Sequence, residues 1–132
     1  MQPPVCVLDA SVGVKWFRNE PGSREARDLL ERHVVGELVL AVDSLFLYEV
    51  LAASARDGRA DDVHRIWDDL DRVDLAVVPL SATLVDAAAR QRDSLGCSLY
   101  DAFSCGLAEL LDSPLYSADA RAHAEFPAVR LL

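Results

Sequence analysis

The sequence of 132 residues has little lysine, little cysteine and no long hydrophobic run. Lys15 is the only lysine, and 22 acidic against 13 basic residues give a net charge of −9, which argues against a broad electrostatic grip on nucleic acid. The three cysteines, Cys6, Cys97 and Cys105, have neither metal-ligand nor disulfide-framework spacing. No stretch approaches the roughly 18 uncharged apolar residues of a membrane span. We therefore expect no membrane association and no disulfide framework.

The first residues also lack the pattern of a secretory signal. Met1-Gln2-Pro3-Pro4 has no basic segment followed by a long apolar one, and a strand is predicted to begin at Val5. We therefore expect a soluble, cytoplasmic protein. The length suits one domain with an ordinary hydrophobic core, and no repeat, linker or low-complexity segment marks a second one. A single domain over residues 1–132 is the expected organisation.

Hydrophobic periodicity predicts strands and helices in alternation. The predicted strands are 5–8, 38–42, 75–80, 115–117 and 129–132. Six helices are predicted between them, the first from about 11 to 17 and the third from 45 to 56. Ser23, Ser81 and Ser98 are three of the predicted N-terminal caps. Strands separated by helices imply βαβ units. The expected fold class is α/β, a three-layer sandwich with a mainly parallel sheet of about five strands and helices on both faces.

Two of the predicted strands lead into an aspartate. The first strand leads directly into Asp9, and the fourth is followed two residues later by Asp119. Open α/β sheets bind ligands at the carboxyl ends of their strands, so neighbouring strands would bring both acids into one crevice. Each acid has a simpler alternative role as a helix cap. Ser11 and Ser117 are expected to support the two acids by hydrogen bonds.

Two further acids interrupt apolar helical stretches. Glu49 lies within residues 45–53, which are apolar on nearly every side, so we expect a buried helix whose glutamate needs a partner. The alternatives for Glu49 are an ion pair with Arg56 or Arg59, or a narrow solvent-facing stripe. Asp101 lies in the first turn of its helix, where the dipole alone favours an acid, but it faces away from that helix's apolar side.

Clustered carboxylates raise one another's pKa, and a hard divalent cation with oxygen ligands relieves the repulsion. We therefore predict that Asp9, Glu49, Asp101 and Asp119 form a site that binds Mg²⁺ or Mn²⁺. His123 is a weaker candidate ligand or general base, because a single histidine on a short polar helix more often lies at the surface.

On these residues the sequence resembles the PIN-domain ribonucleases, and most closely the small VapC-type toxins of toxin-antitoxin pairs. The resemblance covers essentially the whole chain and rests on four segments in a fixed order. These segments are 7–11 (VLDAS), 48–50 (YEV), 99–102 (LYDA) and 115–119 (LYSAD). The resemblance implies that the four acids bind Mg²⁺ or Mn²⁺, that Ser11 and Ser117 assist them, and that the sheet has five parallel strands.

The same resemblance implies a metal-dependent endoribonuclease that hydrolyses RNA phosphodiester bonds as the toxin of such a pair. It also implies a homodimer and a cognate antitoxin protein that covers the cleft. The chemistry suits the acids independently, since a carboxylate-held cation can activate water for attack on a phosphodiester. The alternative is a catalytically silent PIN-like module that binds a partner or RNA without cutting.

A signalling receiver domain has a similar length, a parallel sheet and an acidic Mg²⁺ site, but the sequence argues against it. A receiver needs paired acids after the first strand, an aspartate that closes the third strand and a late lysine. Here the third strand ends in Val77-Val78-Pro79-Leu80, and no lysine follows Lys15. A haloacid-type phosphotransferase is disfavoured as well, because Asp9-Ala10-Ser11 lacks the second aspartate.

Overall fold

The computed structural model describes residues 2–55 and 58–132 and alternates strands with helices, as the periodicity predicts. The strands are β1 (Val5–Leu8), β2 (Val39–Asp43), β3 (Ala76–Val78), β4 (Leu115–Ser117) and β5 (Val129–Leu131). The helices are α1 (Ala10–Gly13), α2 (Ser23–Val34), α3 (Ser44–Ser54), α4 (Ala60–Val73), α5 (Ala82–Leu95), α6 (Leu99–Leu111) and α7 (Ala120–His123), with a 3₁₀ turn η1 (Val14–Phe17) after α1.

The five strands form one sheet in the order β3-β2-β1-β4-β5, and every neighbouring pair is parallel. The chain builds the sheet outward from β1 in one direction and then returns to add β4 on the other side. The order therefore reverses between β1 and β4, which is where sheets of this kind open a crevice at the carboxyl ends of the strands. The predicted α/β fold with a parallel sheet of five strands is confirmed.

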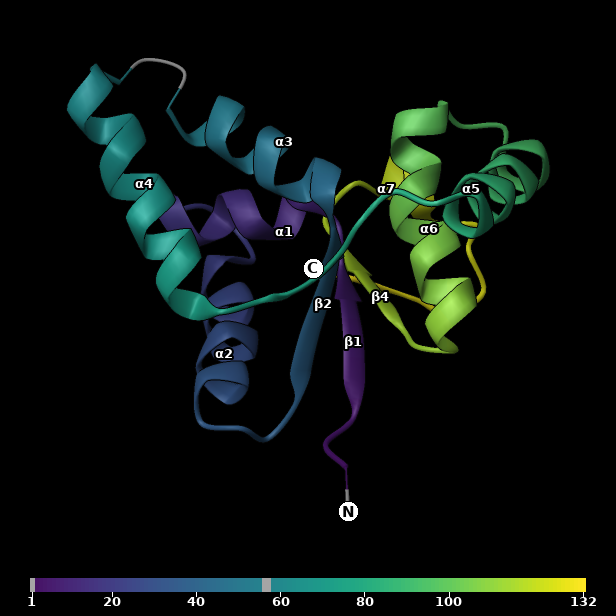
Figure 1. The fold of residues 1–132 in the computed structure, drawn as a ribbon, viewed down its shortest axis with the longest axis horizontal. Coiled ribbons are helices and arrows are strands. Elements are labelled where there is room, and N and C mark those ends of the chain that lie inside the picture. The colour runs from purple at the N-terminus through teal and green to yellow at the C-terminus, as the bar shows by residue number, and fades with distance from the viewer. Residues whose placement is uncertain (1, 56–57) are drawn as a thin grey trace.

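Successive residues of the central strands point to opposite faces of the sheet, and each face has its own hydrophobic core. Cys6 and Leu8 of β1 pack into a core that α1, α2, α3 and α4 cover. Val7, between them, packs into a second core with Leu107 and Leu115. In Figure 1 the first four helices lie on one side of the sheet, and α5 and α6 lie on the other. This arrangement confirms the predicted three layers.

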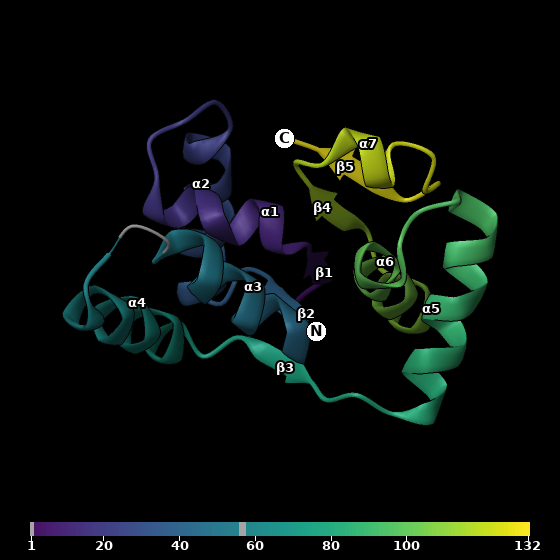
Figure 2. The ribbon, with the colours of Figure 1, turned by 90° about the horizontal axis from the view of Figure 1, so that it is seen from above.

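The helices α5 and α6 pack side by side on the second face (Figure 2). Gly106 of α6 is buried at their contact, where a Cβ atom would lie 2.7 Å from the backbone nitrogen of Ala88. A side chain at position 106 would therefore force the two helices apart. This close approach holds α6, which carries Asp101, against α5.

Three predictions of local structure need correction. The hydroxyl of Ser23 does not cap α2; Gly22 is the N-cap, with a positive φ of 88°, and Ser23 instead binds the backbone of Arg18 and Glu20. The predicted helix 11–17 begins one residue earlier and divides into α1 and η1. The third strand is shorter than 75–80, because Pro79 has no N–H to donate to the sheet.

Other boundaries agree with the sequence patterns. Ser81 and Ser98 accept hydrogen bonds from the backbone N–H groups of Leu84 and Asp101 and so cap α5 and α6. The predicted helix end at Arg56 lies outside the described residues. Within residues 2–55 and 58–132, no helix is long and apolar enough to cross a membrane.

Candidate active site

The candidate site lies at the carboxyl edge of the three central strands. Asp9 follows β1, Asp43 ends β2 and Asp119 follows β4. The N–H of Asp9 donates to the carbonyl oxygen of Tyr116 at 3.0 Å, which keeps the ends of β1 and β4 level. The topology therefore brings Asp9 and Asp119 to the same switch point, as the sequence pattern predicts.

Three hydrogen bonds fix the carboxylate of Asp9. Ser11 donates its backbone N–H at 3.0 Å and its hydroxyl at 2.7 Å to one oxygen, and Ser104 of α6 donates its hydroxyl at 3.2 Å to the other. Ser11 also accepts the N–H of Ala118 at 2.9 Å and so links β1 to the segment after β4. Asp9 is the N-cap of α1, so the simpler role considered for it also holds.

Asp119 is held in a similar way. Its N–H donates to the hydroxyl oxygen of Ser117 at 3.0 Å, and its carboxylate accepts the N–H of Ala122 at 3.1 Å. Asp119 therefore caps α7, as expected, and Ser117 fixes the backbone before it. The support expected from Ser11 and Ser117 corresponds to these hydrogen bonds.

Asp101 lies in the first turn of α6, on the face of the sheet that α5 and α6 cover. Its carbonyl oxygen lies 2.7 Å from Nε2 of His123, and Nδ1 of the same ring lies 2.7 Å from the Ser117 hydroxyl. A carbonyl oxygen can only accept, so Nε2 carries a proton. His123 therefore connects α6 to the end of β4.

The expectation that His123 lies at the surface is wrong. Its side chain is fully buried, with 0% exposure, because α7 folds over the end of β4 against the start of α6. The polar composition of α7 gave no sign of this burial. Since the ring bonds Ser117 and the Asp101 backbone, its observed contacts position other residues of the site.

The prediction of an all-round buried helix for Glu49 is also wrong. Phe46 and Val50 are the buried residues of α3, whereas Tyr48 and Glu49 are exposed. The solvent-facing stripe considered for Glu49 is therefore the arrangement present. Among the described residues Glu49 forms no ion pair, and Arg59 pairs with neither it nor another site acid. Arg56, the other partner considered, lies outside the described residues.

Asp43 is a further acid of the site. It is buried, it caps α3 by accepting the N–H of Phe46 at 2.9 Å, and it lines a small cavity together with Asp9 and Glu49. The sequence suggested Asp43 or Ser44 only as a helix cap, and an N-cap pattern gives no sign of a neighbouring acid on another strand. Ser104 was missed for the same reason, since its bond to Asp9 depends on the packing of α6.

The acids repel one another across this edge of the sheet. Loss of surrounding water raises the pKa of Glu49 to about 7, the charges of Asp9, Asp43 and Asp101 add to the rise, and His123 lowers it. Burial also raises the pKa of Asp43, against the hydrogen bond from Phe46 and together with the charge of Asp9. Acids from three other elements therefore affect the pKa of Glu49, although its side chain remains in contact with solvent.

The donor chemistry fits a divalent cation. Asp9, Asp43 and Glu49 line one small cavity, and carboxylate oxygen is a ligand that Mg²⁺ and Mn²⁺ prefer. No Lys or Arg in the described residues forms an ion pair with these acids, so their mutual repulsion is left for a cation to relieve. The side chains are not yet arranged as ligands, because no three His, Cys, Asp or Glu of residues 2–55 and 58–132 form a group that could hold a metal ion.

The sequence matches the PIN domain family over residues 6–128, which is most of the chain. The chain belongs to the PIN domain family. Members of this family are generally nucleases, and this member carries acids at the carboxyl edge of its sheet. No curated protein matches the sequence.

Three solved structures share this PIN fold over nearly their whole length. A toxin-antitoxin complex from Klebsiella pneumoniae has 19% identity and a TM-score of 0.74, with 95% of each chain covered. VapBC2 from Rickettsia felis, bound to a promoter DNA fragment, has 14% identity and a TM-score of 0.72, with 97% of each chain covered. DNA-bound VapBC from Salmonella typhimurium has 15% identity and a TM-score of 0.71, with 98% of this chain and 97% of that chain covered. At these identities the likeness establishes the fold.

Proposed function

We propose that this PIN-domain protein is a metal-dependent endoribonuclease and the toxin of a toxin-antitoxin pair. It hydrolyses RNA phosphodiester bonds with Mg²⁺ or Mn²⁺ held by Asp9, Glu49, Asp101 and Asp119. The observation that carries the proposal is the mutual repulsion of acids from separate elements at one edge of the sheet. The charges of Asp9, Asp43 and Asp101 add to the loss of surrounding water that raises the pKa of Glu49 to about 7, and no basic side chain within the described residues forms an ion pair with these acids.

The residues of the chain divide this work between them. Ser11 and Ser104 fix both oxygens of Asp9 and so present that carboxylate in one orientation. His123 and Ser117 bind the backbone at Asp101 and Asp119, and the hydrogen bond between their own side chains holds these two segments together. Glu49, on the solvent side, is the acid that can turn toward an incoming ion. When bound, the cation supplies positive charge for the phosphodiester and lowers the pKa of a water for attack.

Cleavage of a panel of RNA oligonucleotides tests the enzyme directly. We expect cleavage in Mg²⁺ or Mn²⁺, none in excess chelator, and at least about a hundredfold loss for Asp9→Asn and Asp101→Asn. Asp68→Asn is the matched control, because Asp68 is exposed on α4 away from the site. Circular dichroism must show that the variants are folded. If the Asp9 and Asp101 variants cut as fast as the parent, the assignment of the site is wrong.

A second candidate function is a PIN module that binds a partner or RNA without cutting it. The observation in its favour is that, in the described residues, no three acids are arranged to hold a metal ion. Titration calorimetry with Mn²⁺ separates the two candidates. A nuclease gives binding heat that Asp9→Asn removes, and a silent module gives none.

The partner proposed for this chain is a cognate antitoxin, and the proposed assembly is a homodimer. The support is the fold shared with chains of toxin-antitoxin complexes from three organisms. Co-expression with the neighbouring small reading frame should yield a copurifying complex in which RNA cleavage is suppressed. Light scattering of the isolated chain should give twice the 14.4 kDa mass of the monomer.

A further inference from the structure

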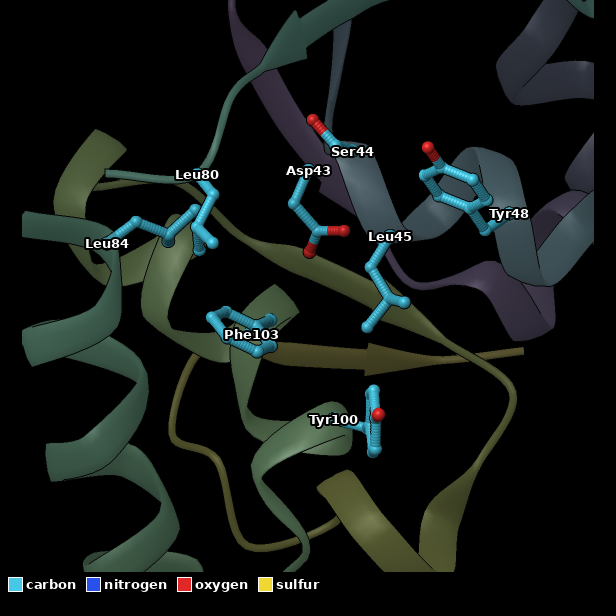
Figure 3. A pocket seen from close by; sticks show the side chains of 8 residues that line it. All are labelled: Asp43, Ser44, Leu45, Tyr48, Leu80, Leu84, Tyr100 and Phe103. Carbon is cyan, nitrogen blue, oxygen red and sulfur yellow. The ribbon is translucent and has the colours of Figure 1, made fainter. Parts of the chain in front are cut away.

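An apolar pocket of about 210 Å³ opens beside the acids. Figure 3 shows it between α3, α6 and the segment that leads into α5. Its walls are six apolar or aromatic side chains. These are Leu45, Tyr48, Leu80, Leu84, Tyr100 and Phe103. The volume is below the roughly 300 Å³ of the smallest drug-sized sites, so it suits one planar ring system rather than a larger ligand.

The pocket is continuous with the candidate active site. Asp43 and Tyr100 line both the apolar pocket and the small cavity that contains Asp9 and Glu49. In Figure 3 the carboxylate of Asp43 points into the space between Leu45 on one side and Leu80 and Leu84 on the other. A ligand in the pocket would therefore lie directly beside a phosphate bound at the acids.

The chemistry of the walls selects a neutral aromatic ligand. A phosphate would be repelled by the carboxylate of Asp43, whereas a neutral ring gains from leaving water. Tyr48 and Tyr100 are 73% and 69% exposed, so both rings remain available for contact with a ligand. Bases of single-stranded RNA stack on such rings, and their apolar faces match the leucine walls.

We propose that this pocket binds one nucleobase of the RNA, adjacent to the phosphodiester held at the acids. The proposal rests on the proposed ribonuclease function and names the substrate group that the site binds beside the reacting phosphate. Tyr48, Leu80 and Tyr100 supply the faces on which the base packs.

Uncharged nucleosides test the pocket without metal and without cleavage. Each of the four nucleosides is titrated into the ¹⁵N-labelled full chain, and amide shifts are followed. We expect saturable shifts at residues 44–48, 80–84 and 100–103. Tyr48→Ala and Leu80→Ala should each weaken nucleoside binding about fivefold, as the loss of one contact surface for the base predicts. Tyr48→Phe, which keeps the ring, should bind like the parent, and so should Leu110→Ala, whose exposed side chain is outside the pocket.

Two results would overturn the pocket assignment. One is the absence of saturable shifts at these residues with any nucleoside. The other is a change from dimer to monomer in Leu80→Ala by light scattering, which would assign the pocket to a second copy of the chain. Neither result touches the ribonuclease proposal, which fails separately if the parent protein cuts no RNA in Mg²⁺ or Mn²⁺.

Discussion

The Nε2 atom of His123 lies 2.7 Å from the carbonyl oxygen of Asp101, although 22 residues separate the two in the sequence. This contact joins α7 to the first turn of α6 and is completed on the other side of the ring by Ser117 at 2.7 Å. The segments that carry the acids Asp101 and Asp119 are thereby both linked to the buried ring of His123.

Loss of His123 should therefore destabilise the fold. His123→Ala leaves a cavity and removes one hydrogen-bond partner each from the Ser117 hydroxyl and the Asp101 carbonyl oxygen, and we expect it to lower the free energy of unfolding by about 2–4 kcal/mol. Urea unfolding followed by circular dichroism measures this. The control is His64→Ala, an exposed position on α4, which should change stability by less than about 0.5 kcal/mol. Equal effects of the two variants would show that the contacts of His123 add nothing to stability.

The charge of Asp43 should affect the electrostatics of the site more than it affects the stability of the fold. Asp43→Asn keeps an oxygen that can cap α3 and removes one negative charge, so the free energy of unfolding should stay the same or rise slightly. Asp43→Ala loses the cap and should cost about 1 kcal/mol. Chemical denaturation of both variants measures the difference. A loss as large in the Asn variant as in the Ala variant would contradict the proposed role of the charge.

Gly106 should tolerate no side chain. In a helix, Gly→Ala ordinarily stabilises by up to about 1 kcal/mol, but here the new Cβ would meet backbone atoms of Ala87 and Ala88 at 2.7–3.0 Å. Overpacking of this kind typically costs about 1–3 kcal/mol, so the net effect of Gly106→Ala should be destabilising. The midpoint of thermal unfolding gives the sign. A more stable variant would mean that α5 and α6 can separate without cost.

The features that follow from local chemistry were predictable from the sequence. Ser81 and Ser98 cap their helices because an N-cap needs only a hydroxyl next to the first turn. The alternation of strands and helices gave the parallel sheet, and Asp9 and Asp119 followed from their positions after two of its strands.

The features that depend on long-range packing were not predictable. The burial of His123 arises because α7 folds onto α6, and no pattern within four helical residues encodes that contact. Glu49 was expected on a buried helix because residues 45–53 are apolar on nearly every side. One side of α3 instead faces solvent beside the acids. The apolar residues Leu45 and Tyr48 there line the pocket rather than the core, which explains why their hydrophobicity misled the prediction.

The stability of the metal-free protein should fall as the pH rises through the range in which Glu49 titrates. Burial and the neighbouring acids raise the pKa of Glu49 from 4.5 to about 7, so between these values the folded state binds a proton that the unfolded chain has released. Such a group stabilises the fold only while it stays protonated, and that contribution is lost as the pH approaches and passes 7. Asp43, whose pKa is also raised, acts in the same direction.

We therefore expect the Tm of the metal-free chain to be lower at pH 8 than at pH 5.5, and the difference to be smaller in Glu49→Gln, which cannot lose a proton. Added Mg²⁺ should raise the Tm at pH 8 in the parent more than in Glu49→Gln, since a cation that binds the folded state offsets the same repulsion. Thermal unfolding in matched buffers, with chelator or with Mg²⁺, measures all three quantities. A Tm that rises from pH 5.5 to pH 8 in the metal-free parent would contradict the repulsion among these acids.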